Sequence, residues 1–250
     1  MKLRALPRLF AIGALIACWA GPARATPPED ARAEECWRRL LADLGHARPD
    51  EAPVRVPFVG YTLRVPPSFL GGIPDPRRGA DGAVVLFAWP PRLAPPTEEQ
   101  RRVLTQPSSP YVRITVFGHE PFLHGQALLD AMSNLARFED TRERDEAGFT
   151  VLRATSAMGL SNNWAEVRVS PDGPEHLFHC MIARPEPDGR KMPPNPLCTT
   201  QRWIGGPLRL EMTFQRVAIP QYRAMAASLE RIFACALDPE ETRSRAWPPR

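Results

Sequence analysis

The feature that most constrains the fold is a series of strand-like segments in the second half of the chain. Five segments between residues 149 and 216 are rich in β-branched and aromatic residues, and turn residues separate them. Pro171-Asp172-Gly173 and Gly205-Gly206 supply the positive φ angles that hairpins need. Because strands joined by short hairpins pair antiparallel, this half of the chain predicts an antiparallel sheet.

The rest of the chain adds further strands and the helices. Three more segments are typical of strands: 54–66, 82–89 and 111–118. Three stretches repeat apolar residues at helical spacing: 34–46, 125–138 and 221–237. We expect Gly45 to stop the first of these helices. This order of elements favours an α+β fold class over a doubly wound parallel sheet. We expect a predominantly antiparallel sheet of about eight strands, pinned by disulfides, with helices packed on its faces.

Length and proline content bound the domain organisation. Prolines make up 30 of the 250 residues, a fraction far above the usual ~5%. They concentrate in loops and tails. We expect a single α+β domain over residues 26–238, with a flexible leader before the helix at 34–46 and a flexible tail over 239–250. The proline-rich loop at 90–110 is long for a connection inside a compact domain, which is typical of a binding element or of a loosely ordered excursion.

Residues 1–25 have the pattern of a signal peptide for export. A basic start precedes an apolar core, Leu9 to Ala20, which is too short to span a bilayer. Ala23-Arg24-Ala25 is the small-x-small pattern that a signal peptidase recognises. We therefore expect the mature chain outside the cytoplasm, in the periplasm or secreted.

An alternative processing signal overlaps this segment. Leu15-Ile16-Ala17-Cys18 resembles the lipobox of bacterial lipoproteins, in which the cysteine becomes the lipidated N-terminus. Gly21-Pro22 and the Ala-x-Ala pattern favour ordinary cleavage after Ala25. Two outcomes stay open: an exported protein without an anchor, and an envelope lipoprotein held at the membrane through Cys18.

The charge balance argues against nucleic acid as a partner. The chain has 32 basic and 28 acidic residues, and four of the basic ones lie in residues 1–25. Without these four, 28 basic residues balance 28 acidic ones, whereas nucleic-acid binders show a clustered basic surplus. The longest charged run, residues 140–148, mixes both signs and is typical of a solvated segment.

Four cysteines remain after either cleavage, and an even number in an oxidising compartment indicates two disulfides. Three pairings are possible. Cys180 lies late in one predicted strand and Cys198 begins the next, so a hairpin would bring them together. Cys36 and Cys235 lie in the first and last predicted helices. We favour Cys180–Cys198 with Cys36–Cys235, which would close a proline-rich loop between Cys180 and Cys198.

A metal site would need His176, His179, Cys180 and Cys198 to converge. Neighbours at 176 and 179, or at 179 and 180, point to opposite faces of a strand, and paired Cys-x-x-Cys spacing is absent. A disulfide would also remove the thiolate that a catalytic Cys–His pair requires. We expect no metal and no cofactor.

No other motif predicts catalysis. His119-Glu120 and His124 lack the His-Glu-x-x-His spacing of zinc proteases, and Ser161 lacks the second glycine of a nucleophile elbow. A carboxylate pair stays open, because three glutamates lie on predicted strands: Glu166, Glu175 and Glu211. We assign no catalytic residue, and the balance favours a protein that is not an enzyme.

Two segments carry a resemblance to known proteins. The stretch FVGYTLRVPPSF (58–69), the hairpin-rich sheet and the closing helix resemble the PsbP-like α/β/α sandwich proteins. CTTQRWIGGPLRLEMTFQR (198–216), followed by a helix, is similar to small periplasmic immunity proteins for type VI secretion effectors. The resemblance implies a non-catalytic binding role and carries no functional residues over.

These observations favour an exported, non-catalytic binding protein with a protein partner, of the kind that inhibits a secreted toxin. The alternatives are an envelope lipoprotein with a structural or assembly role and a hydrolase without a recognisable motif. Aromatic and arginine side chains on proline-stiffened loops are typical anchors of protein interfaces. The candidate partner-binding residues are Trp89, Arg92, Arg190 and Lys191.

Overall fold

The computed structural model describes most of the chain between Pro28 and Leu237. The described residues are 28–58, 61–70, 83–104, 106, 109–118, 123, 125–135, 138–145, 147–154, 163–183, 197–205 and 208–237. Some predictions concern residues outside this set. They are the export signal at 1–25, which includes Cys18, the tail at 239–250, and six single residues: His119, Glu120, His124, Ser161, Arg190 and Lys191.

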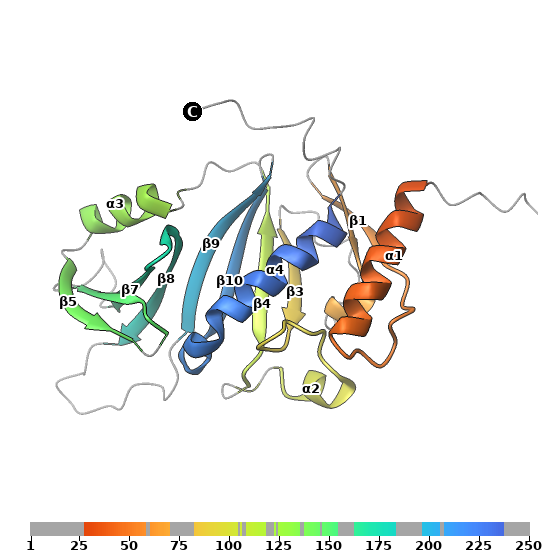
Figure 1. Ribbon diagram of the computed structural model, residues 1–250, viewed down its shortest axis with the longest axis horizontal. Coiled ribbons are helices and arrows are strands. Elements are labelled where there is room, and N and C mark those ends of the chain that lie inside the picture. The colour runs from red at the N-terminus through yellow and green to blue at the C-terminus, as the bar shows by residue number, and fades with distance from the viewer. Residues whose placement is uncertain are drawn as a thin grey trace, which may run out of the picture.

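An eight-stranded antiparallel sheet forms the centre of the molecule (Figure 1). Its strand order is β3-β4-β10-β9-β8-β7-β6-β5, and each neighbouring pair runs antiparallel. With its helices, the chain has the α+β fold that the sequence predicts. The strands are β3 Ala83–Ala88, β4 Val112–Phe117, β5 Phe138–Arg144, β6 Thr150–Ala154, β7 Asn163–Ser170, β8 Gly173–Ala183, β9 Leu197–Gly205 and β10 Leu208–Gln215. The helices are α1 Pro28–Asp43, α2 Glu98–Arg102, α3 Gly125–Leu135 and α4 Tyr222–Ala236, with 3-10 turns η1 Pro67–Phe69 and η3 Arg216–Gln221.

The membership of the sheet differs from the prediction in two places. Strands β1 (Val54–Phe58) and β2 (Tyr61–Val65) form a separate two-stranded sheet. Strand β5 is an addition that the sequence does not predict: it covers residues 138–144, the first part of the charged run 140–148, and pairs with β6 at the end of the sheet order. Glu143 and Arg144 in this strand are exposed, as expected for a solvated segment. Charged residues are compatible with an edge strand, because they discourage pairing with other chains.

Helix α4 covers one face of the sheet, as Figure 1 shows. Tyr222 at its start lies 4.7 Å from the Phe178 ring centroid and 5.8 Å from that of Phe214. Both phenylalanines are fully buried, and Phe149 joins the cluster at 5.1 Å from Phe178. Fully burying one such side chain contributes about 1.5–3 kcal/mol, and the cluster adds to the burial of Met225, Leu229 and Ile232 farther along α4.

Helix α3 packs on the opposite face. Met132 of α3 forms a smaller buried cluster with Val167 of β7 and Leu177 of β8. Because side chains alternate along a strand, Leu177 points away from the face that carries Phe178. The two helices therefore sandwich the sheet, as the apolar stripes of their sequences predict.

Helix α1 begins at Pro28, six residues before the predicted start at 34. Proline suits the first helical turn because it has no N–H to leave unpaired. Asp30 in this turn binds two arginines of the β1–β2 sheet, with Oδ1 accepting from Arg55 Nε at 3.0 Å and from Arg64 Nε at 2.9 Å. The predicted leader at 26–33 is thus helical from residue 28 onward, because this acidic turn has partners that only the fold supplies.

The end of α1 follows the prediction that Gly45 stops the helix. Gly45 has a φ of 71°, in the left-handed region that favours glycine. The N–H of Gly45 donates to the carbonyl of Ala42 at 3.0 Å, and the N–H of His46 donates to that of Leu41 at 2.9 Å. This is the hydrogen-bond pattern of a Schellman motif, and it fixes the direction in which the chain leaves the helix.

Two disulfides join distant parts of this fold. Cys36 of α1 is bonded to Cys235 of α4, with their Cα atoms 5.4 Å apart. Cys180 of β8 is bonded to Cys198 of β9, and these two residues are direct partners in the strand register. Both bonds match the pairing that the sequence analysis favours.

We predict that loss of the helix disulfide costs more stability than loss of the strand disulfide. In the chain-entropy model, the 199-residue separation of Cys36 and Cys235 corresponds to about 5 kcal/mol, and the 18-residue separation of Cys180 and Cys198 to about 3 kcal/mol. Urea unfolding of Cys36→Ser/Cys235→Ser and of Cys180→Ser/Cys198→Ser measures both. Equal losses would contradict this ranking.

Two partly buried histidines each have one buried ring nitrogen without a hydrogen bond. Nδ1 of His179 in β8 and Nε2 of His46 have no hydrogen-bond partner among the described residues. Burial holds the pKa of each ring below its usual 6.5, and Glu51 partly opposes this effect at His46. The folded protein therefore favours both rings in their neutral form.

We predict that folding stability decreases as the pH falls below about 6.5. Below that pH the unfolded chain binds protons at these rings more readily than the folded protein, so the stability is lost between the unfolded pKa and the lower folded pKa. Thermal unfolding at pH 7.5 and pH 5 should show a smaller pH effect in His179→Gln than in the wild type. An identical pH effect in both proteins would rule out His179 as a source.

Candidate functional site

One row of residues crosses the sheet and marks where several loops leave it. Ala88 of β3 pairs with Val112 of β4, and the row continues through Phe214, Cys198 and Cys180 in β10, β9 and β8. Immediately beyond this row lie the proline-rich loop after β3, η3 after β10, and the start of β9. These segments therefore emerge from the same end of the sheet, where α2 lies in Figure 1. We call this the loop end, and its described surface residues include Trp89, Arg92, Arg101, Leu197, Arg216 and Val217.

The proline-rich loop begins with a small closed turn. Trp89 and Ala94 exchange two backbone hydrogen bonds, of 2.7 and 3.1 Å. Leu93 inside this turn has a φ of 54° and is fully buried. A left-handed conformation costs a non-glycine residue about 1–2 kcal/mol, and burying a leucine side chain contributes about 1.5–3 kcal/mol. Burial of Leu93 thus offsets the backbone cost and anchors the turn.

Further contacts tie the rest of the loop to the domain. Thr97 and Gln100 form a capping box at the start of α2, with hydrogen bonds of 2.9 and 3.2 Å. Arg101 in α2 donates from Nη2 to the carbonyl of Ser68. Near the end of the loop, the carbonyl of Ser109 accepts a buried hydrogen bond from Nε2 of Gln215. The described parts of the loop are therefore held at both ends.

An open groove of about 750 Å³ lies between this loop and the segment that follows α1. One wall is formed by residues 44–48, and the other by the loop from Trp89 to Arg101, together with Ser68. We call it the proline-loop groove, because Pro90, Pro91, Pro95 and Pro96 line it. The Schellman motif that ends α1 positions the first of these walls.

Two arginines of the groove have no carboxylate partner among the described residues. Arg92 donates from Nη1 to the carbonyl of Asp43 at 3.2 Å, and Arg101 binds the carbonyl of Ser68. Backbone carbonyls orient a guanidinium but carry no net charge. The positive charges of Arg92 and Arg101 are thus positioned without being neutralised.

Glu51, an acidic residue beside the groove, is already engaged. Glu51 accepts from the backbone N–H of Ser68 at 3.1 Å and contacts Arg48 at 3.4 Å. Its other neighbour is His46, whose Nε2 lies 3.9 Å from Oε2 of Glu51. Only Glu98 adds an exposed carboxylate to the lining. The groove is therefore net positive.

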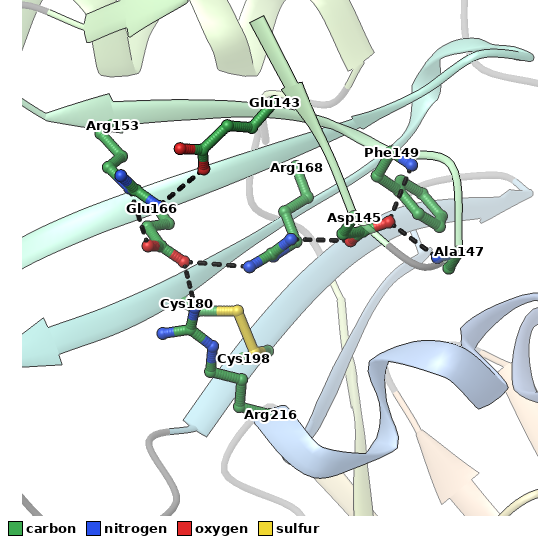
Figure 2. Close-up of polar contacts among 10 residues, drawn as sticks. All are labelled: Glu143, Asp145, Ala147, Phe149, Arg153, Glu166, Arg168, Cys180, Cys198 and Arg216. Atoms are coloured by element: carbon green, nitrogen blue, oxygen red, sulfur yellow. Dashed lines mark hydrogen bonds and ion pairs between the residues drawn. A yellow bond between two sulfur atoms is a disulfide. The ribbon is translucent and has the colours of Figure 1, made fainter. Parts of the chain in front are cut away.

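A second cluster lies beside the strand disulfide, and Figure 2 shows it. Glu166 of β7 pairs with Cys180 in the register, and its side chain is 5% exposed. Its carboxylate contacts three arginines: Arg153 Nε at 3.2 Å, Arg168 Nη2 at 3.1 Å and Arg216 Nη2 at 2.8 Å. One buried carboxylate thus links β6, β7 and η3 across the loop end.

Asp145 extends this cluster to the turn after β5. Its Oδ2 lies 2.7 Å from Nη1 of Arg168. Its Oδ1 accepts from the backbone N–H groups of Ala147 at 3.0 Å and Phe149 at 2.9 Å (Figure 2). Arg168 is therefore compensated by two carboxylates, which explains how a 6% exposed guanidinium is accommodated.

Two large apolar side chains at the loop end face solvent. Leu197 at the start of β9 is 52% exposed, and Val217 in η3 is 65% exposed. Among the described residues only one other large apolar side chain, Leu123, is as open. Leu197 is the register partner of Gln215, two residues before Val217. Exposed apolar side chains that share one surface are typical of a protein interface.

The structure brings together only part of the predicted site. Trp89 and Arg92 both line the proline-loop groove. Arg190 and Lys191 lie outside the described residues. The contributions of Arg101, Leu197 and Val217 escaped the sequence analysis, since arginines and single apolar residues are common and only the register places these at one end of the sheet.

Cys180 and Cys198 are joined in a disulfide, and the other described side chains that we considered do not converge on one site. His176 contacts Arg202 at 3.2 Å and lines a pocket with α4, whereas His179 alternates to the other face of β8. Glu211 is oriented away from Glu166, because its neighbour Met212 lies in the core under α4. Within the described part of the chain, no three His, Cys, Asp or Glu residues are grouped to hold a metal ion. None of the helices described there combines the length and the apolar composition that a membrane span requires.

Comparisons with known proteins give a distant likeness of fold. No family model matches the chain, and no curated protein matches it. An immunity protein of the Stenotrophomonas maltophilia type IV secretion system has 13% identity and a TM-score of 0.46, covering 75% of this chain and 94% of that one. The iron-regulated outer membrane lipoprotein FrpD of Neisseria meningitidis has 7% identity and a TM-score of 0.48, covering 74% and 92%.

One of these two structures is an immunity protein, the general class that the sequence of residues 198–216 resembles. The immunity protein belongs to a type IV system, not to the type VI systems named above. The resemblance to PsbP-like proteins stays a prediction. With such low identities and TM-scores, neither structure bears on the function of this chain.

We predict that Glu166→Gln destabilises the fold by about 3 kcal/mol, because it leaves Arg168 buried with less compensating charge. Glu143→Gln is the matched control, since Glu143 is 56% exposed and contacts Arg153 at 2.8 Å in the same cluster. An exposed pair contributes about 1 kcal/mol or less. Urea unfolding measures both variants, and a loss at Glu166 no larger than that at Glu143 would contradict the prediction.

Proposed function

We propose that this protein is an exported binding protein that holds a protein partner at the loop end of its sheet. The observation that carries the proposal is the convergence of binding features on that end. The net positive proline-loop groove and the exposed Leu197 and Val217 come from segments that are far apart in sequence. Two disulfides support a location outside the cytoplasm, where such bonds persist.

The construction of the loop end also supports binding. Docking costs less free energy when loops do not have to be ordered. The Trp89–Ala94 turn, the buried Leu93 and the capping box of α2 hold the proline-rich loop before any partner arrives. Trp89 and Arg92 are residue types that dominate interface energies, and both are presented from this loop.

The more specific form of this proposal is that the partner is a secreted toxin that the protein inhibits. The resemblance of residues 198–216 to immunity proteins motivates it. The described part of this segment includes β9 from Cys198 onward, β10 and Arg216, the first residue of η3. Arg216 and the beginning of β9 lie at the loop end. Inhibition then requires only that the bound protein cover part of the toxin surface, and it needs no catalytic group.

Site-specific photo-crosslinking in the native envelope tests the binding surface. A photoreactive residue replaces Arg92 in the groove or Leu197 beside η3, and crosslinked products are identified by mass spectrometry. The control position is Asp130, which is exposed on α3. We expect both loop-end positions to capture the same exported protein and the α3 position not to capture it.

Two results would contradict the proposal. One is capture of the same proteins from Asp130 as from the loop end, and the other is no capture at Arg92 or Leu197. If a partner is captured, co-production with it tests the toxin form. Rescue of growth by wild type but not by a loop-end variant supports inhibition, whereas a partner that is harmless on its own excludes it.

A further inference from the structure

We propose that the proline-loop groove binds an acidic segment of the partner polypeptide, with carboxylates of that segment paired to Arg92 and Arg101. This inference rests on the proposed function and specifies the chemistry of its ligand. The groove has a surplus of positive charge. Both arginines donate hydrogen bonds to neutral backbone carbonyls, and neither has a carboxylate partner among the described residues.

The hydrogen-bonding capacity of Arg92 points the same way. A guanidinium has five N–H donors, and Arg92 uses one of them, on the carbonyl of Asp43. Its side chain is exposed at the groove wall. The remaining donors suit a planar carboxylate, which two parallel N–H groups of one guanidinium can bind.

The nearby acidic side chains do not supply that carboxylate. The carboxylate of Asp43 binds Arg231 at 2.5 Å, although its backbone carbonyl holds Arg92. Glu51 is oriented toward Ser68, Arg48 and His46. Glu98 is the one exposed carboxylate in the described lining, against Arg92, Arg101 and Arg48, so the groove keeps a positive balance.

The form of the groove favours a polypeptide over a small anion. It is open, holds about 750 Å³, and combines the two arginines with the apolar surfaces of Trp89, Pro90 and Pro91. A small inorganic ion would leave most of that surface unused. A peptide can place acidic side chains on the arginines and apolar groups on the tryptophan and prolines at once.

Arg55 is an exposed arginine outside the groove whose positive charge is compensated by a carboxylate. Arg55 is 52% exposed, and its guanidinium is paired with the carboxylate of Asp30. It lies on β1, next to the beginning of α1, whereas the groove lies at the end of that helix. Arg55 therefore serves as a matched control: an exposed arginine outside the groove whose charge is already neutralised.

Selection from a random decapeptide phage library on the immobilised mature protein tests this inference. We expect the enriched peptides to contain a surplus of Asp and Glu over the unselected library, and this surplus to disappear with Arg92→Gln. The surplus should persist with Arg55→Gln. A synthetic copy of the most enriched peptide should bind Arg92→Gln and Arg101→Gln about tenfold more weakly than wild type by fluorescence anisotropy.

Folding controls keep these variants interpretable. Arg101 holds the carbonyl of Ser68, so the unfolding midpoint of Arg101→Gln is measured first. Arg92 is exposed, and its variant carries the test if Arg101→Gln is unfolded. Replacing each acidic residue of the peptide with Asn or Gln should remove binding, and added salt should weaken it.

Three outcomes would overturn the inference: enriched peptides without an acidic surplus, no enrichment at all, or an acidic surplus that Arg92→Gln retains. Displacement of the peptide by an equal concentration of citrate would assign the groove to small carboxylates instead. The proposed function is judged separately. If crosslinking at the Arg92 position still captures a partner after any of these outcomes, the binding role stands and only the acidic ligand is excluded.

Discussion

The packing of α4 on the sheet is the interaction on which the rest of this structure depends. Tyr222 at the start of the helix lies against Phe178 and Phe214, so the helix direction is set where β10 ends. Farther along the helix, Cys235 holds α1 through its disulfide. The end of α1 in turn forms one wall of the proline-loop groove. The aromatic cluster therefore orients the elements that build the candidate site, although none of its rings lines the groove.

Two groups of charged residues at the loop end differ in whether their charges are paired. Beside the strand disulfide, Glu166 is surrounded by arginines and Arg168 by carboxylates, and this balance is needed because both groups are buried. At the groove, Arg92 and Arg101 are held by carbonyl oxygens, which leave their charges available. A buried charge has to be compensated inside the fold, whereas an exposed charge without a carboxylate partner is available to a binding partner. Under our proposal, the arginines of the groove select an acidic segment of that partner.

The sequence predicts some features of the fold well, for local reasons. Hairpin-joined strands, the glycine stop at Gly45 and the apolar stripe of α4 depend on neighbouring residues, so their patterns are visible in the chain. The edge strand β5 is hidden by its charges, which resemble those of a solvated loop. The early start of α1 was missed because Asp30 finds its two arginines on a hairpin more than twenty residues away.

By itself, the sequence determined the α+β class, the favoured disulfide pairing and the choice of Trp89 and Arg92 as binding candidates. These follow from spacing, composition and the chemistry of an oxidising compartment. Only the tertiary structure decided that Arg101, Leu197 and Val217 share one end of the sheet with them, and that Glu166 is a buried ionic centre. The physical reason is strand register. It places side chains from distant segments in one row, and no local pattern in the sequence encodes which distant strand will lie beside which.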